Sequence, residues 1–142
     1  MLITNRPQVI NERLEFGHWE GDLMMFKRGI KSNLLTLRER KTRYLIAIKN
    51  ENKTARATAL ALISTVKSIK SAIKTITFDQ GSEFQNYRWI KDCLDVSIYF
   101  CHPAAPHEKG CIENGNGILR VELPRQTNID VIKSHEINQL TY

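Results

Sequence analysis

The sequence predicts one α/β domain with a mixed five-stranded sheet, in which three strands are antiparallel, two are parallel and helices cover both faces. Three observations predict this fold class. The 142 residues suit a single domain that can bury about two-thirds of the surface of its unfolded chain. Three strand-like runs follow one another closely, and strands joined by short turns pair antiparallel. Two later runs each follow a helix-like segment, and strands reached through helices add in parallel.

Five apolar runs have the length and the flanking residues of strands. They cover residues 19–26, 33–38, 43–49, 73–78 and 96–101. Lys27-Arg28-Gly29 after the first run is a turn signal, and the short charged link 39–42 favours a hairpin between the second and third runs. The fifth run stops before Pro103, which cannot donate a backbone hydrogen bond to a sheet.

Four segments have helical patterns. They cover residues 54–69, 87–94, 108–121 and a last stretch that starts at Ser134. In the first of them, Leu62 and Val66 recur at helical spacing, and Thr54 can cap the helix start. Residues 1–15 are polar and are expected to be a tail or the remnant of a linker, which leaves residues 16–142 for the folded core.

The net charge of +6 is unevenly distributed along the chain. Residues 1–71 hold 14 Lys and Arg against 6 Asp and Glu, and residues 72–142 hold 7 against 9, so the two halves carry +8 and −2. The densest basic stretch runs from Lys27 to Arg43. A positive surface attracts the phosphate backbone of nucleic acids and releases its counterions. The alternative is a solvated basic hairpin without a partner.

Membrane and secreted classes are not favoured. No apolar run approaches the roughly 18 residues that a membrane-spanning helix needs, and the first residues lack the apolar core of a secretory signal. Three cysteines without framework spacing fit reduced thiols better than disulfides. We therefore expect a cytoplasmic protein.

Two aspartates have distinctive places in the predicted sheet. Asp22 lies inside the first strand, where Asp is disfavoured, and alternates with Glu20 on one face. Asp79 follows the fourth strand at its carboxyl end, where open sheets commonly place their sites. Each also has a plainer interpretation: a hydrogen-bonded structural residue for Asp22, and a turn residue for Asp79.

Glu113 lies in a segment that is unusual for a helix. Residues 114–117 (Asn-Gly-Asn-Gly) form helices poorly, so a helix that keeps them has something close to its surface. Arg120, seven residues after Glu113, falls on the same face and could reach a phosphate. Carboxylates brought together from separate elements can hold two divalent cations and catalyse phosphodiester chemistry.

A zinc site is an alternative for the region around the last predicted strand. Cys101, His102, His107 and Cys111 lie close in sequence, and zinc takes Cys and His ligands. Their spacing matches no common zinc knuckle. Packed cysteines and exposed histidines are therefore the plainer interpretation.

Four stretches of the chain match a known pattern in order and spacing. They are residues 18–22 (His-Trp-Glu-Gly-Asp), 36–44 (Thr-Leu-Arg-Glu-Arg-Lys-Thr-Arg-Tyr), 79–84 (Asp-Gln-Gly-Ser-Glu-Phe) and 99–120. Together they resemble DDE transposases of bacterial insertion sequences, specifically the insertion sequence 30 family. The resemblance covers residues 16–130 and implies the RNase-H-like fold of retroviral-integrase catalytic cores.

The resemblance also implies a mechanism. Asp22, Asp79 and Glu113 would form the catalytic triad and hold two Mg²⁺ ions, for which Mn²⁺ can substitute. Water would cut the element end, and the freed 3′-hydroxyl would then attack target DNA. The implied partners are double-stranded DNA, at the element ends and at the target, and a second copy of the chain. The implied place of action is the bacterial nucleoid.

Charge and helix facing give candidates for DNA contact, namely Lys109, Asn116 and Arg120. Glu108 departs from the family pattern, which has an uncharged or basic residue at this position. An acid there would weaken the approach of DNA. Family members also carry a helix-turn-helix region before the core and a further helix after it. We therefore expect a catalytic core that is truncated at its C-terminal end. The alternatives are an inactive DNA-binding remnant and an RNase-H-like nuclease that hydrolyses without joining.

Overall fold

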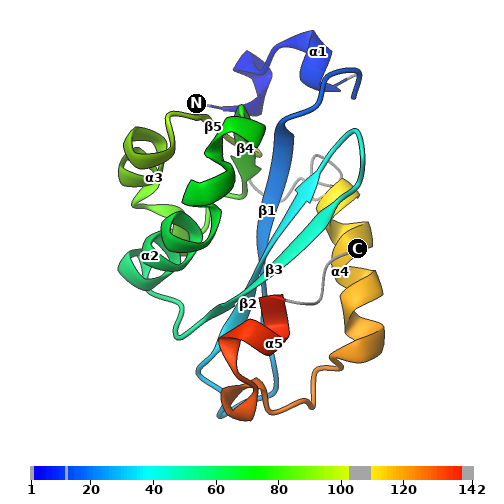
Figure 1. Ribbon diagram of the computed structural model, residues 1–142, viewed down its shortest axis with the longest axis vertical. Helices are drawn as coiled ribbons and strands as arrows, with labels where there is room; N and C mark the ends of the chain where they lie inside the picture. The colour runs from blue at the N-terminus through cyan, green and yellow to red at the C-terminus, as the bar shows by residue number, and fades with distance from the viewer. Residues whose placement is uncertain (1, 12, 103–109, 139–142) are drawn as a thin grey trace.

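The computed structural model describes residues 2–11, 13–102 and 110–138, and its centre is a five-stranded sheet (Figure 1). The strands are β1 (His18–Met24), β2 (Asn33–Glu39), β3 (Leu45–Asn50), β4 (Thr75–Phe78) and β5 (Ser97–Phe100). They lie in the order β3-β2-β1-β4-β5. β1, β2 and β3 pair antiparallel, whereas β4 pairs in parallel with β1 and β5. The predicted mixed sheet is confirmed, and each strand begins and ends within two residues of its predicted bounds.

Helices cover both faces of this sheet. The α-helices are α1 (Gln8–Asn11), α2 (Ala55–Val66), α3 (Tyr87–Leu94), α4 (Gly110–Glu122) and α5 (Ser134–Asn138). The 3-10 helices are η1 (Ile3–Asn5), η2 (Lys67–Ala72), η3 (Ser82–Phe84) and η5 (Ile129–Val131). Figure 1 shows α2 and α3 on one side of the sheet and α4 and α5 on the other. No helix in the described part of the chain is long and apolar enough to cross a membrane.

Each face of the sheet has its own hydrophobic core. On the side of α2 and α3, the buried residues include Trp19, Leu35, Leu37, Leu62, Val66, Ile76, Phe78, Ile90 and Leu94. On the side of α4 and α5, they include Met24, Leu34, Leu45, Ile112, Leu119 and Ile137. Since successive strand residues point to opposite faces, Trp19 enters the first core, while Glu20 and Asp22 point to the side of α4.

The predicted helix over residues 54–69 is shorter in the structure. Thr54 caps α2 as predicted, because its hydroxyl accepts a hydrogen bond from the Ala57 amide at 3.2 Å. α2 ends at Val66, and the chain continues as η2, in which Ile69 is non-helical at φ −117° and ψ 19°. The Trp19 indole donates to the Ala72 carbonyl at 3.1 Å, so a tertiary contact fixes the end of this segment.

The first residues, expected to be a tail or linker remnant, pack against the sheet. Ile10 is only 1% exposed. The Arg6 guanidinium donates to the Thr77 hydroxyl at 3.1 Å, and Leu2 forms a parallel bridge with Phe100 of β5. The sequence signal is weak here because the helices are short and these contacts reach residues distant in sequence.

Gly21 of β1 is required by the packing of the first core. A Cβ atom there would lie 2.4 Å from Cε1 of Phe78 and 3.1 Å from Cδ2 of Leu37. We expect Gly21→Ala to lower the free energy of unfolding by about 1–3 kcal/mol, because overpacking forces the buried ring to move. Urea unfolding measures this loss.

Gly117 of α4 supplies the matched control. A Cβ atom there meets nothing within 4 Å, and Ala forms helices better than Gly, so Gly117→Ala should stabilise the protein by about 0.5–1 kcal/mol. Equal effects of the two substitutions would contradict the proposed close contact at Gly21.

Candidate active site

Asp22 lies in β1, and Asp79 immediately follows β4, the strand that pairs in parallel with β1. The register of these two strands pairs Glu20 with Thr77. If that register continued for two more residues, it would set Asp22 beside Asp79. Side chains two residues apart share a face of a sheet, so we expect both carboxylates on the face that α4 covers.

Asn116 of α4 holds the Asp22 side chain. The Asn116 amide nitrogen donates to Oδ2 of Asp22 at 3.3 Å, and its oxygen accepts from the Thr36 hydroxyl at 2.8 Å. Oδ1 of Asp22 accepts from the Leu23 amide at 2.9 Å. The two bonds of Asn116 fix its amide orientation, so a residue predicted to contact DNA here positions a carboxylate.

Glu113 is exposed in the first turn of α4. It lies one helical turn from Asn116, which faces Asp22, whereas Asn114 on the other flank accepts a hydrogen bond from Arg38 of β2 at 2.8 Å. Among the described residues, no three His, Cys, Asp or Glu side chains are close enough to hold a metal ion. Closure of Glu113 onto the two aspartates stays a prediction.

A compact turn fixes Asp79 after β4. Oδ1 of Asp79 accepts from the Gly81 amide at 2.8 Å, and Gln80 donates to the Cys101 carbonyl at 2.9 Å. The carboxylate of Glu83, which is 9% exposed, lies against Gly81, where a Cβ atom would be 2.6 Å from its Oε1. A side chain at position 81 would therefore displace the Glu83 carboxylate from beneath this turn.

Glu20 is a site residue that the sequence analysis did not single out. It is completely buried and forms an ion pair with Nη1 of Arg40 at 2.6 Å. Its other oxygen accepts from the Ile112 amide in the first turn of α4 at 3.3 Å. Burial raises the pKa of the Glu20 carboxyl, and the Arg40 charge and the Ile112 amide oppose that rise. Glu20 thereby ties the start of α4 to β1. The only available sequence signal was a second acid two residues before Asp22.

The remaining predicted DNA contacts have different positions. Arg120 donates to the Met25 carbonyl and lies over the Phe26 ring, 4.9 Å from its centroid. Its Nη1 is buried without a hydrogen-bond partner among the described residues, and burial lowers the pKa of the guanidinium. The structure gives Arg120 a packing contact. Lys109 lies outside the described residues.

The alternative zinc ligands are dispersed. Cys101 and Cys111 are buried, and His102 is half-buried. Burial raises the pKa of the Cys111 thiol, which disfavours the thiolate that zinc binds. His107 lies outside the described residues, and the part of the chain that the structure describes contains no cluster of three metal-ligating side chains.

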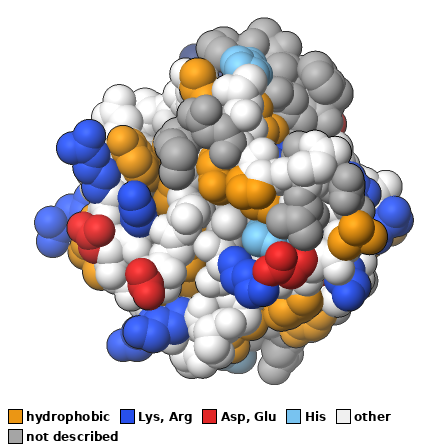
Figure 2. All heavy atoms as spheres, turned by 90° about the horizontal axis from the view of Figure 1, so that it is seen from above, with side chains coloured by type: hydrophobic (Ala, Val, Ile, Leu, Met, Phe, Trp, Pro, Cys, Tyr) orange, Lys and Arg blue, Asp and Glu red, His pale blue; other side chains and the backbone are white. Residues whose placement is uncertain are grey.

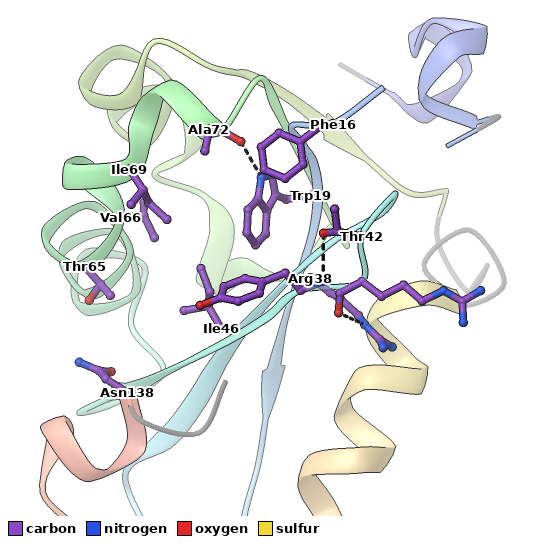
Figure 3. Close-up of a pocket in the computed structure, with 12 residues that line it drawn as sticks. Phe16, Trp19, Arg38, Thr42, Ile46, Thr65, Val66, Ile69, Ala72 and Asn138 are labelled. Atoms are coloured by element: carbon purple, nitrogen blue, oxygen red, sulfur yellow. Dashed lines mark hydrogen bonds between the residues drawn. The ribbon is translucent and has the colours of Figure 1, made fainter. Parts of the chain in front are cut away.

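A cavity of about 810 Å³ has neither Asp22 nor Asp79 among its lining residues. Figure 3 shows Phe16, Trp19, Val66 and Ile69 around it, and the Arg38 side chain reaching from β2 toward α4. The lining contains no acid. Trp19 and Val66 of α2 are among its lining residues, and the described lining offers no carboxylate to a divalent cation.

Comparison with known proteins identifies the family. Residues 12–106 match the model of the integrase core domain, which is more than half of the chain. The chain belongs to the integrase core domain family. The mixed sheet is thus that of an integrase core domain, and the family expected from four short motifs is confirmed.

Curated relatives of this integrase core domain are insertion-sequence transposases. The chain is 34% identical over 136 residues to the transposase for insertion sequence element IS1086 of Cupriavidus metallidurans, and 33% identical over 137 residues to the transposase InsI for IS30A of Escherichia coli. These matches cover 95% and 96% of the chain but 40% and 35% of the relatives. The chain therefore spans well under half the length of these transposases.

Solved structures confirm the fold. A chain of the simian T-cell lymphotropic virus intasome matches with a TM-score of 0.65 at 21% identity, covering 76% of this chain and 40% of that one. The HTLV-2 integrase catalytic core domain, solved with magnesium in a dimeric form, matches with a TM-score of 0.58 at 18% identity, covering 75% of this chain and 69% of that one. The RNase-H-like fold of retroviral integrase cores is the fold of this chain.

Proposed function

We propose that this chain is the catalytic core of a transposase that cleaves DNA at the ends of an insertion element and joins them to target DNA. The parallel pairing of β1 with β4 supports the proposal, because Asp22 lies in β1 and Asp79 immediately follows β4. Glu113 comes from α4, whose Asn116 donates a hydrogen bond to Asp22. Neighbouring strands lie about 4.8 Å apart, a spacing at which two carboxylates can share a cation.

The donor set fits Mg²⁺, with Mn²⁺ as a substitute. Asp22, Asp79 and Glu113 offer only carboxylate oxygens, which are the ligands that hard divalent cations prefer. Two such cations would activate the attacking oxygen and stabilise the leaving oxygen of an in-line displacement. Asn116 would hold the Asp22 carboxylate in place, and Gly81 that of Asp79. Glu113 would be the third carboxylate of the ligand set. Three carboxylates repel one another, so a bound cation would favour their coming together.

DNA is the substrate that the charge supports. The first half of the chain carries +8 (14 Lys and Arg against 6 Asp and Glu), and Figure 2 shows Lys and Arg side chains at several places on one end of the molecule. Lys109, Asn116 and Arg120 remain our candidates for DNA contact, although the contacts of the last two within the protein would have to open. Action on two element ends would also require two copies of the chain, as a homodimer. The place of action would be the bacterial nucleoid.

The test uses a branched DNA duplex that mimics the joined product. Since a catalyst accelerates a reaction in both directions, a joining enzyme also resolves this branch, and the assay needs no knowledge of the element ends. We expect resolution with Mg²⁺ or Mn²⁺ and none with a chelator. Hydrolysis of DNA without any joining or branch resolution would favour the nuclease alternative. DNA binding without either reaction would favour the inactive remnant.

A further inference from the structure

A small cavity at the start of α4 is lined by three arginines. It has a volume of about 210 Å³ and lies among Arg13, Arg38, Arg43, Gly110, Cys111 and Asn114. Arg38 and Arg43 come from β2 and the turn after it, whereas Arg13 comes from the segment before β1. Two segments that are distant in sequence thus bring three charges to one place.

Among the described residues that line this cavity, none is an Asp or a Glu. The buried acid Glu20 forms its ion pair with Arg40, which is not a lining residue. Like charges held together without a counter-charge repel one another, so a bound anion would stabilise this arrangement.

Arg38 presents a fixed guanidinium. It is 6% exposed, its Nε donates to the Arg43 carbonyl at 2.9 Å, and its Nη1 donates to the Cys111 carbonyl at 3.0 Å and to Asn114 at 2.8 Å. These bonds use three of the five donors of a guanidinium, which leaves the two on Nη2. A preorganised guanidinium loses little entropy on binding an oxyanion, and its fork matches phosphate geometry.

Arg13 and Arg43 contribute two further positive charges around the Arg38 guanidinium. Arg43 is exposed and Arg13 is half-buried. Both have left-handed backbones, with φ of 56° for Arg13 and 65° for Arg43. The N-terminal turn of α4, beginning at Gly110, contributes the positive end of its helix dipole.

We propose that this three-arginine cavity binds a phosphate group of the DNA backbone. The inference rests on the proposed function, because DNA is the polyanion it supplies. The cavity is lined by Asn114 of α4, whereas Asn116, two positions further along the helix, holds Asp22 and lies outside the lining. The phosphate bound there is therefore not the reacting one. It anchors the backbone across the first turn of the helix that carries Glu113, and so fixes the register of DNA relative to the carboxylates.

The double variant Arg13→Gln/Arg43→Gln tests the proposal and leaves the structural hydrogen bonds of Arg38 in place. Anisotropy of a labelled DNA duplex is measured over a series of salt concentrations. We expect binding to weaken about tenfold and the slope of log K against log salt to fall by about one. Arg56→Gln, an exposed arginine in the first turn of α2 on the other face, should change neither quantity.

The outcomes separate this inference from the proposed function. If the unmodified chain binds no DNA, the proposed function fails with it. If that chain binds DNA and the double variant binds equally well with the same salt slope, the phosphate site is refuted while the function stands. Inorganic phosphate provides the third arm. If it raises the melting temperature of the unmodified chain but not of the double variant, while DNA binding is unchanged, the cavity takes free phosphate and the DNA proposal is wrong. Should the double variant fold poorly by circular dichroism, each single variant is measured in the same way.

Discussion

Asp79→Asn is expected to abolish metal-dependent branch resolution and joining while leaving the fold intact. The substitution removes the charge that a divalent cation needs but keeps an oxygen that can accept from the Gly81 amide. Loss of such a stabiliser of transition-state charge lowers the rate by about 10³-fold or more. The free energy of unfolding should change by less than about 0.5 kcal/mol, because Asn has nearly the shape of Asp and keeps the bond to the Gly81 amide.

The measurement is branch resolution with Mg²⁺ and with Mn²⁺, accompanied by calorimetric titration of Mn²⁺. Asp92→Asn, at an exposed position of α3, is the matched control and should retain both activity and Mn²⁺ affinity. Resolution by Asp79→Asn at the rate of the unmodified chain would remove Asp79 from the site, and with it the proposed triad.

Among the substitutions of charged residues, Arg40→Met is expected to lower the free energy of unfolding the most. It removes the partner of Glu20, which is completely buried. Breaking a buried ion pair from one side strands a charge and costs about 3–5 kcal/mol. The same change loosens α4, because Glu20 accepts the Ile112 amide. Replacing both partners, as Glu20→Gln/Arg40→Met, should recover much of the loss, since no charge is then left buried.

The pH dependence distinguishes a stranded charge from lost packing. Burial already raises the pKa of Glu20 in the folded protein, and removal of Arg40 raises it further. A carboxyl whose folded pKa exceeds its unfolded value contributes stability that is present at low pH and is lost as the pH rises through the folded pKa. The deficit of Arg40→Met should therefore be larger at about pH 7 than at about pH 5 in urea unfolding. A deficit that is equal at both pH values would mean that packing alone is responsible. Arg56→Met, at an exposed position, should show no deficit.

Local patterns were sufficient to predict the sheet. The apolar runs gave all five strands, and the lengths of the links between them gave their relative directions. Alternation along β1 also predicted that Glu20 and Asp22 share a face and that Trp19 takes the other. These features depend on residues near one another in sequence, where period and turn chemistry are informative.

Contacts between distant segments could not be predicted in this way. The Glu20–Arg40 pair joins β1 to the turn after β2, and the hydrogen bond of Glu20 to Ile112 spans 92 positions. Helix facing put Asn116 and Arg120 on one side of α4, but their partners, Asp22 and the Met25 carbonyl, depend on how the helix lies on the sheet. These two candidates for DNA contact therefore also make contacts within the protein that the sequence did not reveal.

The bridge between Leu2 and Phe100 has a consequence for the behaviour of the molecule in solution. β5 is an outer strand of the sheet, and the free backbone groups of an outer strand can pair with another chain. The bridge from Leu2 covers the end of β5 that includes Phe100. Removing the first few residues would uncover that end, and the shortened protein would gain a route to edge-to-edge aggregation even if its active site were unchanged.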